Sequence, residues 1–386
     1  MLITSEQKEH QRLAREFTEE HIIPIAAEYD RKGEFPEFIV EEGRKAGLLS
    51  MGIPKEFGGL GLDSVTQAII LEELGRGCAG LATAFSVNEL GYYAPLIAGT
   101  DEQKKLYFTS VVEGSLSSFA LTEPSAGSDV RGARTTARKV GDEYILNGSK
   151  CFITNGAYAK MLTIFALTDP SKGLKGLSAF IVKGGSPGLM IPKHENKLGI
   201  RSSNTVELVL QDLHVPANQL LGKEGDGMKI AMTSLDMARP MVGAQSVGIA
   251  QRALDECLKY LGEKFSDPRK IGQATQFKLA DMRIGIEAAR QTVYHALSVK
   301  DAGLPYSVEA AIAKTLGSDT AMRVSKDALA LLGAYGYSDD SVVEKLVRDA
   351  KIQQLYEGTN QVQRIVIAAQ MMAAIQPKVA AAKAGR

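Results

Sequence analysis

The sequence predicts an α+β protein in three parts: an N-terminal helical domain, a middle β domain and a C-terminal helical bundle. Apolar residues recur at helical spacing up to about residue 115 and again from about residue 231. Between residues 117 and 230 they alternate with a period of two, and turn dipeptides follow at short intervals. A chain of 386 residues is long enough for two to three domains. We therefore expect domains at 1–116, 117–230 and 231–386.

Individual segments support each part. Residues 64–75 place apolar side chains near one stripe, with Glu72 and Glu73 at its edge, which predicts a helix in the first domain. In the middle domain, residues 135–140 and 143–146 flank Gly141-Asp142, a two-residue hairpin signal. A half-buried strand is predicted where apolar residues alternate at Val206, Leu208 and Leu210. A long helix in the third domain is predicted from the apolar face Ala250, Leu254, Cys257, Leu258 and Leu261.

Charge and cysteine content exclude several classes of protein. The 45 basic and 45 acidic residues cancel, so the chain has no net attraction to nucleic acid or to anionic lipid. Cys78, Cys151 and Cys257 form no CxxC pair, which favours a reducing compartment. The N-terminus lacks the apolar stretch of a signal peptide, and no apolar run is long enough to span a bilayer. We expect a cytoplasmic protein with no nucleic-acid partner and no membrane insertion.

Common catalytic motifs are missing from the sequence. It contains no dinucleotide-binding GxGxxG opening a βα unit, no GxxxxGK[ST] phosphate loop and no GxSxG elbow. The five histidines are far apart and form no HExxH pattern, so no metal site is expected. Hydrolase and zinc-enzyme interpretations are weak.

Two segments carry more polar and conformationally special residues than their surroundings. The segment 119–129, at the start of the β region, can present hydroxyl and N–H groups to a phosphate or a polar heterocycle, or it is a local turn and cap cluster. In the segment 352–361, Glu357 stands between Tyr356 and Gly358. Its carboxyl is either a general base whose pKa is raised by burial or a solvated side chain at a helix end.

In their order and spacing these segments resemble the acyl-CoA dehydrogenase family over essentially the whole chain. The other matching stretches are Glu56-Phe57-Gly58-Gly59-Leu60-Gly61, Asn147-Gly148-Ser149-Lys150, Phe152-Ile153-Thr154-Asn155-Gly156, Leu220-Leu221-Gly222, Gln276-Phe277-Lys278-Leu279-Ala280-Asp281-Met282 and Arg348-Asp349-Ala350. The resemblance implies a middle domain of β-barrel or sandwich type and a C-terminal four-helix bundle. It also implies FAD, an acyl-CoA substrate, a homotetramer built as a dimer of dimers, and an electron-transferring flavoprotein as electron acceptor.

The resemblance also assigns the site residues. Glu357 corresponds to the base that removes the α-proton of an acyl thioester while the β-hydrogen leaves as hydride to flavin N5, giving a 2-enoyl thioester. The base's own N–H and a flavin hydroxyl stabilise the developing charge on the thioester oxygen. Positions implied in FAD binding are Phe119, Leu121, Thr122, Gly127, Ser128, Phe152, Thr154, Gln273, Thr359 and Gln361. Positions implied in substrate binding are Glu89, Ser128, Arg239, Tyr356 and Gly358. For Arg239, a structural ion pair is an equal alternative.

The chain departs from the family pattern where relatives carry Arg-x-x-Phe-Gly, whose arginine reaches the FAD pyrophosphate of the neighbouring subunit. Here residues 263–273 are shorter and rearranged, with Lys264 or Arg269 as candidate replacements and Gln273 taken as a cofactor-binding position. Relatives also read Gln-Ile-Phe-Gly-Gly where this chain has Ala330-Leu331-Leu332-Gly333-Ala334. We expect weaker FAD retention than is usual in the family.

Glu89 adds a carboxylate to the segment that lines the acyl pocket in relatives. It is either solvated, or it binds a polar acyl substituent, or it acts as an additional base on a cyclic or unsaturated acyl group. The bulky Phe85, Tyr92 and Tyr93 hint at short, branched or cyclic acyl groups. Other possibilities are an oxidase, a thioester of acyl carrier protein in place of CoA, and a flavin-poor binding subunit.

Overall fold

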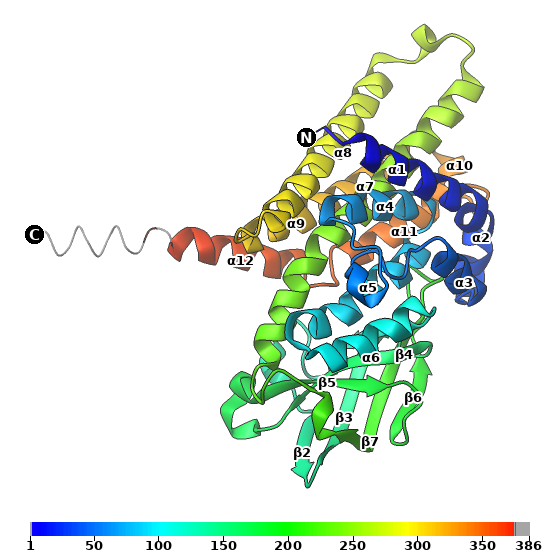
Figure 1. The fold of residues 1–386 in the computed structure, drawn as a ribbon. Helices are drawn as coiled ribbons and strands as arrows, with labels where there is room; N and C mark the ends of the chain where they lie inside the picture. Colours follow the sequence, from blue (N-terminus) through cyan, green and yellow to red (C-terminus); the bar gives the residue numbers. More distant parts are fainter. Residues whose placement is uncertain (1, 374, 376–386) are drawn as a thin grey trace, which may run out of the picture.

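The computed structural model describes residues 2–373 and 375. It begins with a layer of helices (Figure 1), and capping side chains open three of them, α1, α4 and α6. Thr4 opens the first helix with a capping box, in which its side chain accepts from the Gln7 N–H and the Gln7 side chain accepts from the Thr4 N–H. The helices are α1 Ser5–Phe17, continued by a π-helical turn Thr18–Ile22, then α2 Ile23–Lys32, α3 Phe38–Lys45, α4 Ser64–Gly77, α5 Ala79–Ala98 and α6 Asp101–Val112.

The middle part is one mixed sheet of eight strands. Its strands are β1 Leu116–Ala120, β2 Thr136–Val140, β3 Glu143–Thr154, β4 Ala159–Leu167, β5 Leu177–Lys183, β6 Leu189–His194, β7 Thr205–Pro216 and β8 Leu220–Leu221. The order is β6-β7-β3-β2-β4-β5-β8, and β1 pairs in parallel with β4. The predicted hairpin at Gly141-Asp142 is confirmed, because Val140 pairs with Glu143. In β7, Val206, Leu208 and Leu210 are buried as predicted.

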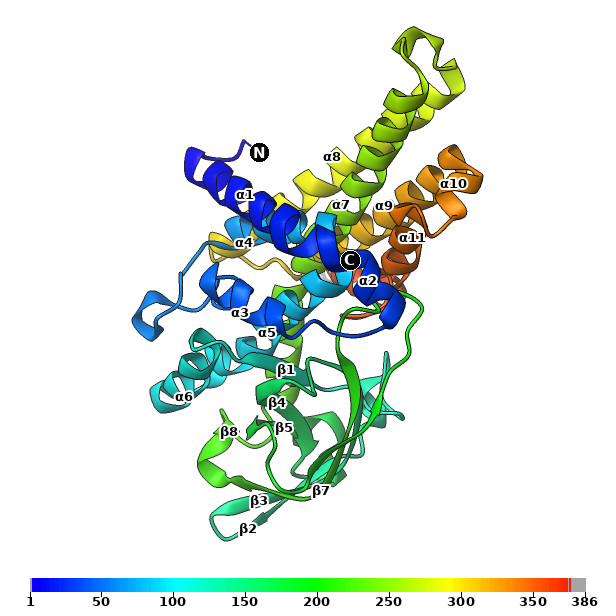
Figure 2. The same ribbon diagram turned by 90° about the vertical axis from the view of Figure 1, so that its right-hand side faces the viewer.

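The third part is again helical. It contains α7 Gly227–Lys264, α8 Gln273–Asp301, α9 Ser307–Leu332, α10 Ala334–Tyr337, α11 Val342–Gln353 and α12 Asn360–Ala373. The far end of α7 and the start of α8 form a hairpin that projects from the molecule, while α12 leaves it in another direction (Figures 1 and 2). The predicted α+β class with helical, β and helical parts is confirmed.

Helices α5, α6 and α7 connect the helical layers to the sheet: α5 and α6 contact β4, and α7 contacts β5. Helices α4 and α7 approach backbone to backbone at two glycines. A Cβ on Gly248 would lie 2.1 Å from the Glu72 carbonyl oxygen, and one on Gly75 would lie 2.7 Å from the Gln245 carbonyl oxygen. Because only glycine fits such a contact, these two positions fix how closely α4 and α7 pack.

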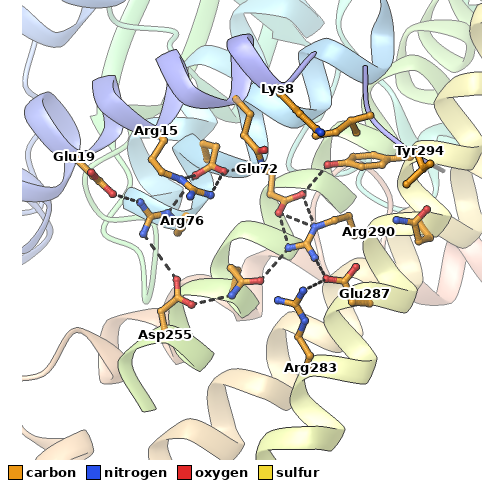
Figure 3. Close-up of a pocket in the computed structure, with 16 residues that line it drawn as sticks. Lys8, Arg15, Glu19, Glu72, Arg76, Asp255, Arg283, Glu287, Arg290 and Tyr294 are labelled. Carbon is orange, nitrogen blue, oxygen red and sulfur yellow. Dashed lines mark hydrogen bonds and ion pairs between the residues drawn. The ribbon is translucent and has the colours of Figure 1, made fainter. Parts of the chain in front are cut away.

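Two details differ from the sequence expectations. Leu258 is 51% exposed, whereas Ala250, Leu254, Cys257 and Leu261 of the predicted face are buried. Glu72 and Glu73 are buried instead of lying at a solvated edge of α4. Figure 3 shows the reason: Arg290 binds Glu72 at 2.7 Å, and Arg15 binds Glu73 at 2.7 Å. Buried carboxylates require such partners.

This cluster lines a groove of about 620 Å³ between α1, α4, α7 and α8. The groove contains five basic and five acidic side chains, most of them joined in ion pairs. Its charges therefore cancel, and its role is to attach α1 and α4 to the bundle. Among the described residues, no helix is long and apolar enough to cross a membrane.

Candidate active site

Glu357 lies in the short connection between α11 and α12. Its backbone is left-handed, with φ of 56°, and the following Gly358 has φ of 86°. The side-chain amide of Gln363, on the first turn of α12, donates to the carbonyl oxygens of Glu357 (3.2 Å) and Gly358 (3.0 Å). A non-glycine residue in this conformation stores strain that the surrounding contacts must hold. The helix connection thus fixes the direction of the Glu357 side chain.

The Glu357 carboxyl is set up electrostatically as a base. Burial raises its pKa to about 7, and the positive charges of Arg239 and Lys314 oppose that rise. Its Oε2 atom is buried and has no hydrogen-bond partner among the described residues. A buried acceptor without a partner is costly, so this oxygen is a position where a bound molecule completes the site. Near neutral pH such a carboxyl both accepts and releases a proton.

The Glu357 main chain is also free to act. No group of residues 2–373 or 375 accepts a hydrogen bond from its N–H. The neighbouring Tyr356 hydroxyl donates to Gln353 Oε1 at 2.7 Å and lies in hydrogen-bond contact with the side chain of Thr83 on α5. Burial raises the pKa of Tyr356 above its ordinary value, so the hydroxyl stays neutral. Tyr356 therefore attaches the loop that carries Glu357 to α5.

Arg239 lies on α7 and faces Glu357 across the site. It is buried, and it donates to Asp236 one turn earlier through a short contact. Its Nε has no partner within the part of the chain that the structure describes. The ion pair expected as one alternative is thus present, and the same guanidinium also lowers the pKa of Glu357. Ala238, beside it, is buried and carries no acid.

The residues expected around the flavin lie on one edge of the sheet. Phe119 lies next to the last residue of β1 and packs on Phe165, with ring centroids 4.8 Å apart. Leu121 and Thr122 follow on the connecting loop, and Gly127 and Ser128 lie at its exposed turn. In the described chain, no protein group hydrogen-bonds the hydroxyls of Thr122, Ser128 or Thr154. A Cβ on Gly127 would meet nothing within 4 Å, so packing does not demand glycine there.

Phe152 and Thr154 belong to the last three residues of β3. The pairing of β3 with β7 shifts register between Lys150 and Ile153, and at this bulge Phe152 adopts φ of 58°. Its ring is 64% exposed although it belongs to a central strand. Asn155 directly follows β3, and its side chain donates to the Ala84 carbonyl on α5 at 2.8 Å. Thr83, the residue before Ala84 on α5, contacts Tyr356. Two consecutive residues of α5 therefore contact the end of β3 and the loop that carries Glu357.

Three predicted FAD residues are not joined to this group within one chain. Gln273 is exposed at the start of α8, on the projecting hairpin. Thr359 caps α12, its hydroxyl accepting from the Val362 N–H at 3.2 Å, and Gln361 is exposed beside it. Arg269, a candidate replacement for the missing arginine, is bound to Asp267 at 2.9 Å.

Glu89 is completely buried on α5, which excludes the solvated alternative. Its two carboxyl oxygens accept long hydrogen bonds from the hydroxyls of Tyr92 (3.2 Å) and Tyr93 (3.3 Å). Burial raises its pKa to about 7, against the lowering effect of these hydroxyls and of Lys300. Phe85, by contrast, packs against α1 and α3, where its ring contacts Phe17.

Three residues of the site had no assigned role from the sequence. One is Lys314 on α9, whose charge acts on Glu357. The other two, Glu123 and Lys150, form a buried ion pair beside the loop that follows β1. Glu123 and Lys150 lie inside stretches that carry the family resemblance, so their residue types were a signal. Lys314 offered none, because a single lysine in a helical sequence is most often at the surface.

This edge of the sheet fits a flavin. An exposed aromatic ring at a strained position, three hydroxyls without protein partners and open space at Gly127 suit a flat heterocycle joined to a pyrophosphate. Phe119, Leu121, Thr122, Phe152 and Thr154 would hold the ring system and Ser128 the pyrophosphate. These seven positions, from Phe119 to Thr154, lie on β1, on β3 and on the loop that follows β1.

Comparison with known proteins identifies relatives along the chain. A curated relative, acryloyl-CoA reductase (NADH) of Anaerotignum propionicum, is 45% identical over 375 residues, covering 96% of this chain and 95% of the relative. The solved butyryl-CoA dehydrogenase of Megasphaera elsdenii superposes with a TM-score of 0.94 at 42% identity, covering 96% of this chain and 99% of that one.

Two further structures resemble the chain. One, described as the electron transferring flavoprotein of Acidaminococcus fermentans, contains a chain with TM-score 0.94 and 44% identity, with 96% of this chain and 99% of that one covered. The other, an acyl-CoA dehydrogenase of Bacillus anthracis complexed with FAD, has TM-score 0.90 and 30% identity, with coverage of 97% and 68%.

Family models match all three parts of the chain. The N-terminal, middle and C-terminal domains of acyl-CoA dehydrogenase match residues 4–115, 118–213 and 225–372. The predictions of an oxidoreductase with an acyl-CoA substrate and FAD as cofactor are confirmed at this level. The chain belongs to the acyl-CoA dehydrogenase family.

Proposed function

We propose that this protein dehydrogenates a short, branched or cyclic acyl-CoA between its α and β carbons, with Glu357 as the base. One observation carries the proposal. The Glu357 carboxyl has a buried oxygen without a partner and a pKa of about 7, and it faces the cations Arg239 and Lys314. A carboxyl with these properties is poised to take a weakly acidic proton at neutral pH.

Each residue of the site has a separate role in this proposal. Glu357 takes the α-proton, and its free N–H donates to the thioester oxygen, where negative charge develops. The turn requires glycine at Gly358, because its φ is 86° and a Cβ there would lie 2.6 Å from Gln363 Nε2. Arg239 favours the ionised form of the base before each turnover. Bound FAD supplies the acceptor for the hydride from the β carbon.

The finer features of the assembly belong to the same proposal. We place FAD against Phe119, Leu121, Thr122, Gly127, Ser128, Phe152 and Thr154, with Gln273, Thr359 and Gln361 reaching it across a subunit contact. Support for a homotetramer comes from exposed apolar side chains on the bundle helices, among them Phe277, Ile284 and Ile365. We further propose the domain boundaries 116/117 and 230/231, an electron-transferring flavoprotein as acceptor, and the cytoplasm as compartment.

The decisive experiment is an anaerobic visible titration of the purified flavoprotein with short linear, branched and cyclic acyl-CoAs. The expected result is bleaching of the flavin by one class of substrate, and loss of bleaching in Glu357→Gln while that acyl-CoA still binds. Full bleaching in Glu357→Gln contradicts the role of Glu357. A protein that stays colourless after FAD is added favours the flavin-poor binding subunit instead.

A second candidate concerns the acyl group, and the buried carboxyl of Glu89 favours it. Its pKa of about 7 and its two long tyrosine contacts match a group that accepts a proton from a more distant carbon of a cyclic or unsaturated acyl chain. Glu89→Gln keeps the size and the hydrogen-bonding capacity of the side chain. Turnover of a cyclic acyl-CoA should fall at least tenfold in this variant while that of butyryl-CoA changes little. Equal effects on both substrates exclude the additional base.

A further inference from the structure

Lys314 is a buried lysine that the reaction as described does not use directly. It lies on α9, and its exposed fraction is 0%. Its ammonium donates to the Gly358 carbonyl oxygen at 3.0 Å and to Asn360 Oδ1 at 2.8 Å. Gly358 directly follows the base, and Asn360 begins α12. The ammonium therefore holds the turn directly on the C-terminal side of Glu357.

The contacts of Asn360 extend this connection along α9. Its side-chain amide donates to Ser318 Oγ (2.9 Å) and to Asp319 Oδ1 (2.7 Å), one turn beyond Lys314. The Gln354 side chain, from the end of α11, also donates to Asp319 at 2.7 Å. Polar groups from α9, α11 and α12 thus meet under the turn, and the network satisfies the buried donors of Lys314.

Charged groups face Glu357 from two packed elements. Arg239 comes from α7, where Asp236 pairs with it, and Lys314 comes from α9, where Asp319 lies near it and is paired with Arg364 of α12. The only titratable neighbour on the loop itself is Tyr356, which is held neutral. Burial lowers the pKa of Lys314 to about 7, while the carboxylates of Glu357 and Asp319 favour its charged form. Glu357 and Lys314 thus stabilise each other's ions.

We propose that Lys314 is a positioning residue for Glu357: its ammonium fixes the turn through the Gly358 carbonyl, and its charge keeps the base ionised at neutral pH. The inference rests on the proposed role of Glu357 as the base. It predicts two separable effects, because a neutral donor at position 314 preserves the hydrogen bonds and removes only the charge. A side chain without a donor removes both.

Three variants separate these effects. Lys314→Gln retains an amide that donates to Gly358 and lacks the charge. In Lys314→Gln, the acid limb of the pH profile for the rate of flavin bleaching should lie about 1–3 pH units higher than in the wild type. At high pH the bleaching rate should reach a plateau near the wild-type value. Lys314→Met should show the same shift and a lower plateau. Ser318→Ala removes a hydroxyl from the same network without changing its charge, and should leave the limb in place.

A second readout does not depend on turnover. Infrared difference spectra recorded against pH follow the C=O band of the protonated Glu357 carboxyl, which is assigned by its loss in Glu357→Gln. That band should persist to higher pH in Lys314→Gln than in the wild type. A limb and a band that stay unmoved in Lys314→Gln overturn the proposal, even if the rate falls at every pH. Retained bleaching in Glu357→Gln refutes the proposed base itself, whatever the Lys314 variants do.

Discussion

Lys150 and Glu123 form a buried ion pair, with Nζ 2.6 Å from Oε1, directly under the loop that carries Thr122 and Ser128. The ammonium also donates to the Leu121 carbonyl at 3.2 Å. On the other side, Glu123 accepts from the backbone N–H groups of Arg134 and Thr135. The pair therefore joins the start and the end of the loop to strand β3.

Lys150→Met should destabilise the protein and loosen the FAD site together. Removing one partner leaves Glu123 buried with no countercharge, which costs about 3–5 kcal/mol. Urea unfolding of the apoprotein should show this loss, and FAD fluorescence titration should show weaker binding. In the double variant Lys150→Met with Glu123→Gln no charge remains, and most of the stability should return. A single variant as stable as the wild type contradicts a structural role for the pair.

Phe152 should lower the stability of the apoprotein and raise its affinity for FAD. Its left-handed backbone costs about 1–2 kcal/mol for a residue with a Cβ, and its ring is largely exposed. Phe152→Gly should leave the apoprotein at least as stable, because strain is relieved. FAD affinity should fall roughly three- to tenfold through the lost ring contact.

Phe152→Ala is the matched control for this prediction. It loses the ring and keeps the strain, so its apoprotein should be less stable than that of Phe152→Gly at a similar FAD affinity. Thermal unfolding of both apoproteins and isothermal titration with FAD provide the comparison. Unchanged FAD affinity in both variants contradicts a cofactor role for Phe152.

The sequence was informative where function depends on a local pattern. The change of hydrophobic period located the three parts, and the resemblance of segment 352–361 to the acyl-CoA dehydrogenase family singled out Glu357 among the acidic residues. It was less informative where a side chain depends on a distant partner. Glu72 reads as a helix-edge carboxylate, and only Arg290, 218 residues away, explains its burial.

The same limit applies to Lys314 and Glu89. Lys314 lies 44 residues from Gly358 in the chain, and no local periodicity encodes the turn between two helices that brings them together. Glu89 lies one turn from its tyrosines, yet its burial depends on α4, α7 and strand β1, which pack around α5. On α7 the periodicity predicted the buried face correctly at Ala250, Leu254, Cys257 and Leu261, and it failed only at Leu258.

The pH dependence of the reaction should reverse with its direction. With a Glu357 pKa of about 7, the carboxylate needed for dehydrogenation increases as the pH rises from 6 to 8. Reduction of a 2-enoyl-CoA needs the protonated carboxyl, so its rate should fall over the same range. The relative described as an acryloyl-CoA reductase makes the second direction worth measuring.

Stopped-flow experiments test this reversal. Bleaching of the oxidised flavin by acyl-CoA and reoxidation of the reduced flavin by enoyl-CoA are recorded between pH 5.5 and 8.5, a range chosen to cover roughly 1.5 units on either side of the pKa. The two profiles should cross near pH 7. Profiles that rise together with pH assign the limb to another group.

Glu357 should also lower the stability of the folded protein as the pH rises. Its pKa is about 7 in the folded state against 4.5 for an ordinary glutamate, so the folded state holds one more proton between these values. The stabilisation from this proton is complete below pH 4.5 and is lost as the pH rises through 7. The loss amounts to at most about 3 kcal/mol.

Glu357→Gln removes this titration. Relative to the wild type, the apoprotein variant should gain nothing at pH 4.5 and about 1–3 kcal/mol at pH 8 in urea unfolding. Glu263→Gln, which changes an exposed carboxylate on α7, should show no such pH-dependent gain. A gain that is the same at both pH values contradicts a buried, titrating Glu357. If the gain grows with pH, the charge that makes Glu357 a base is maintained against the stability of the fold.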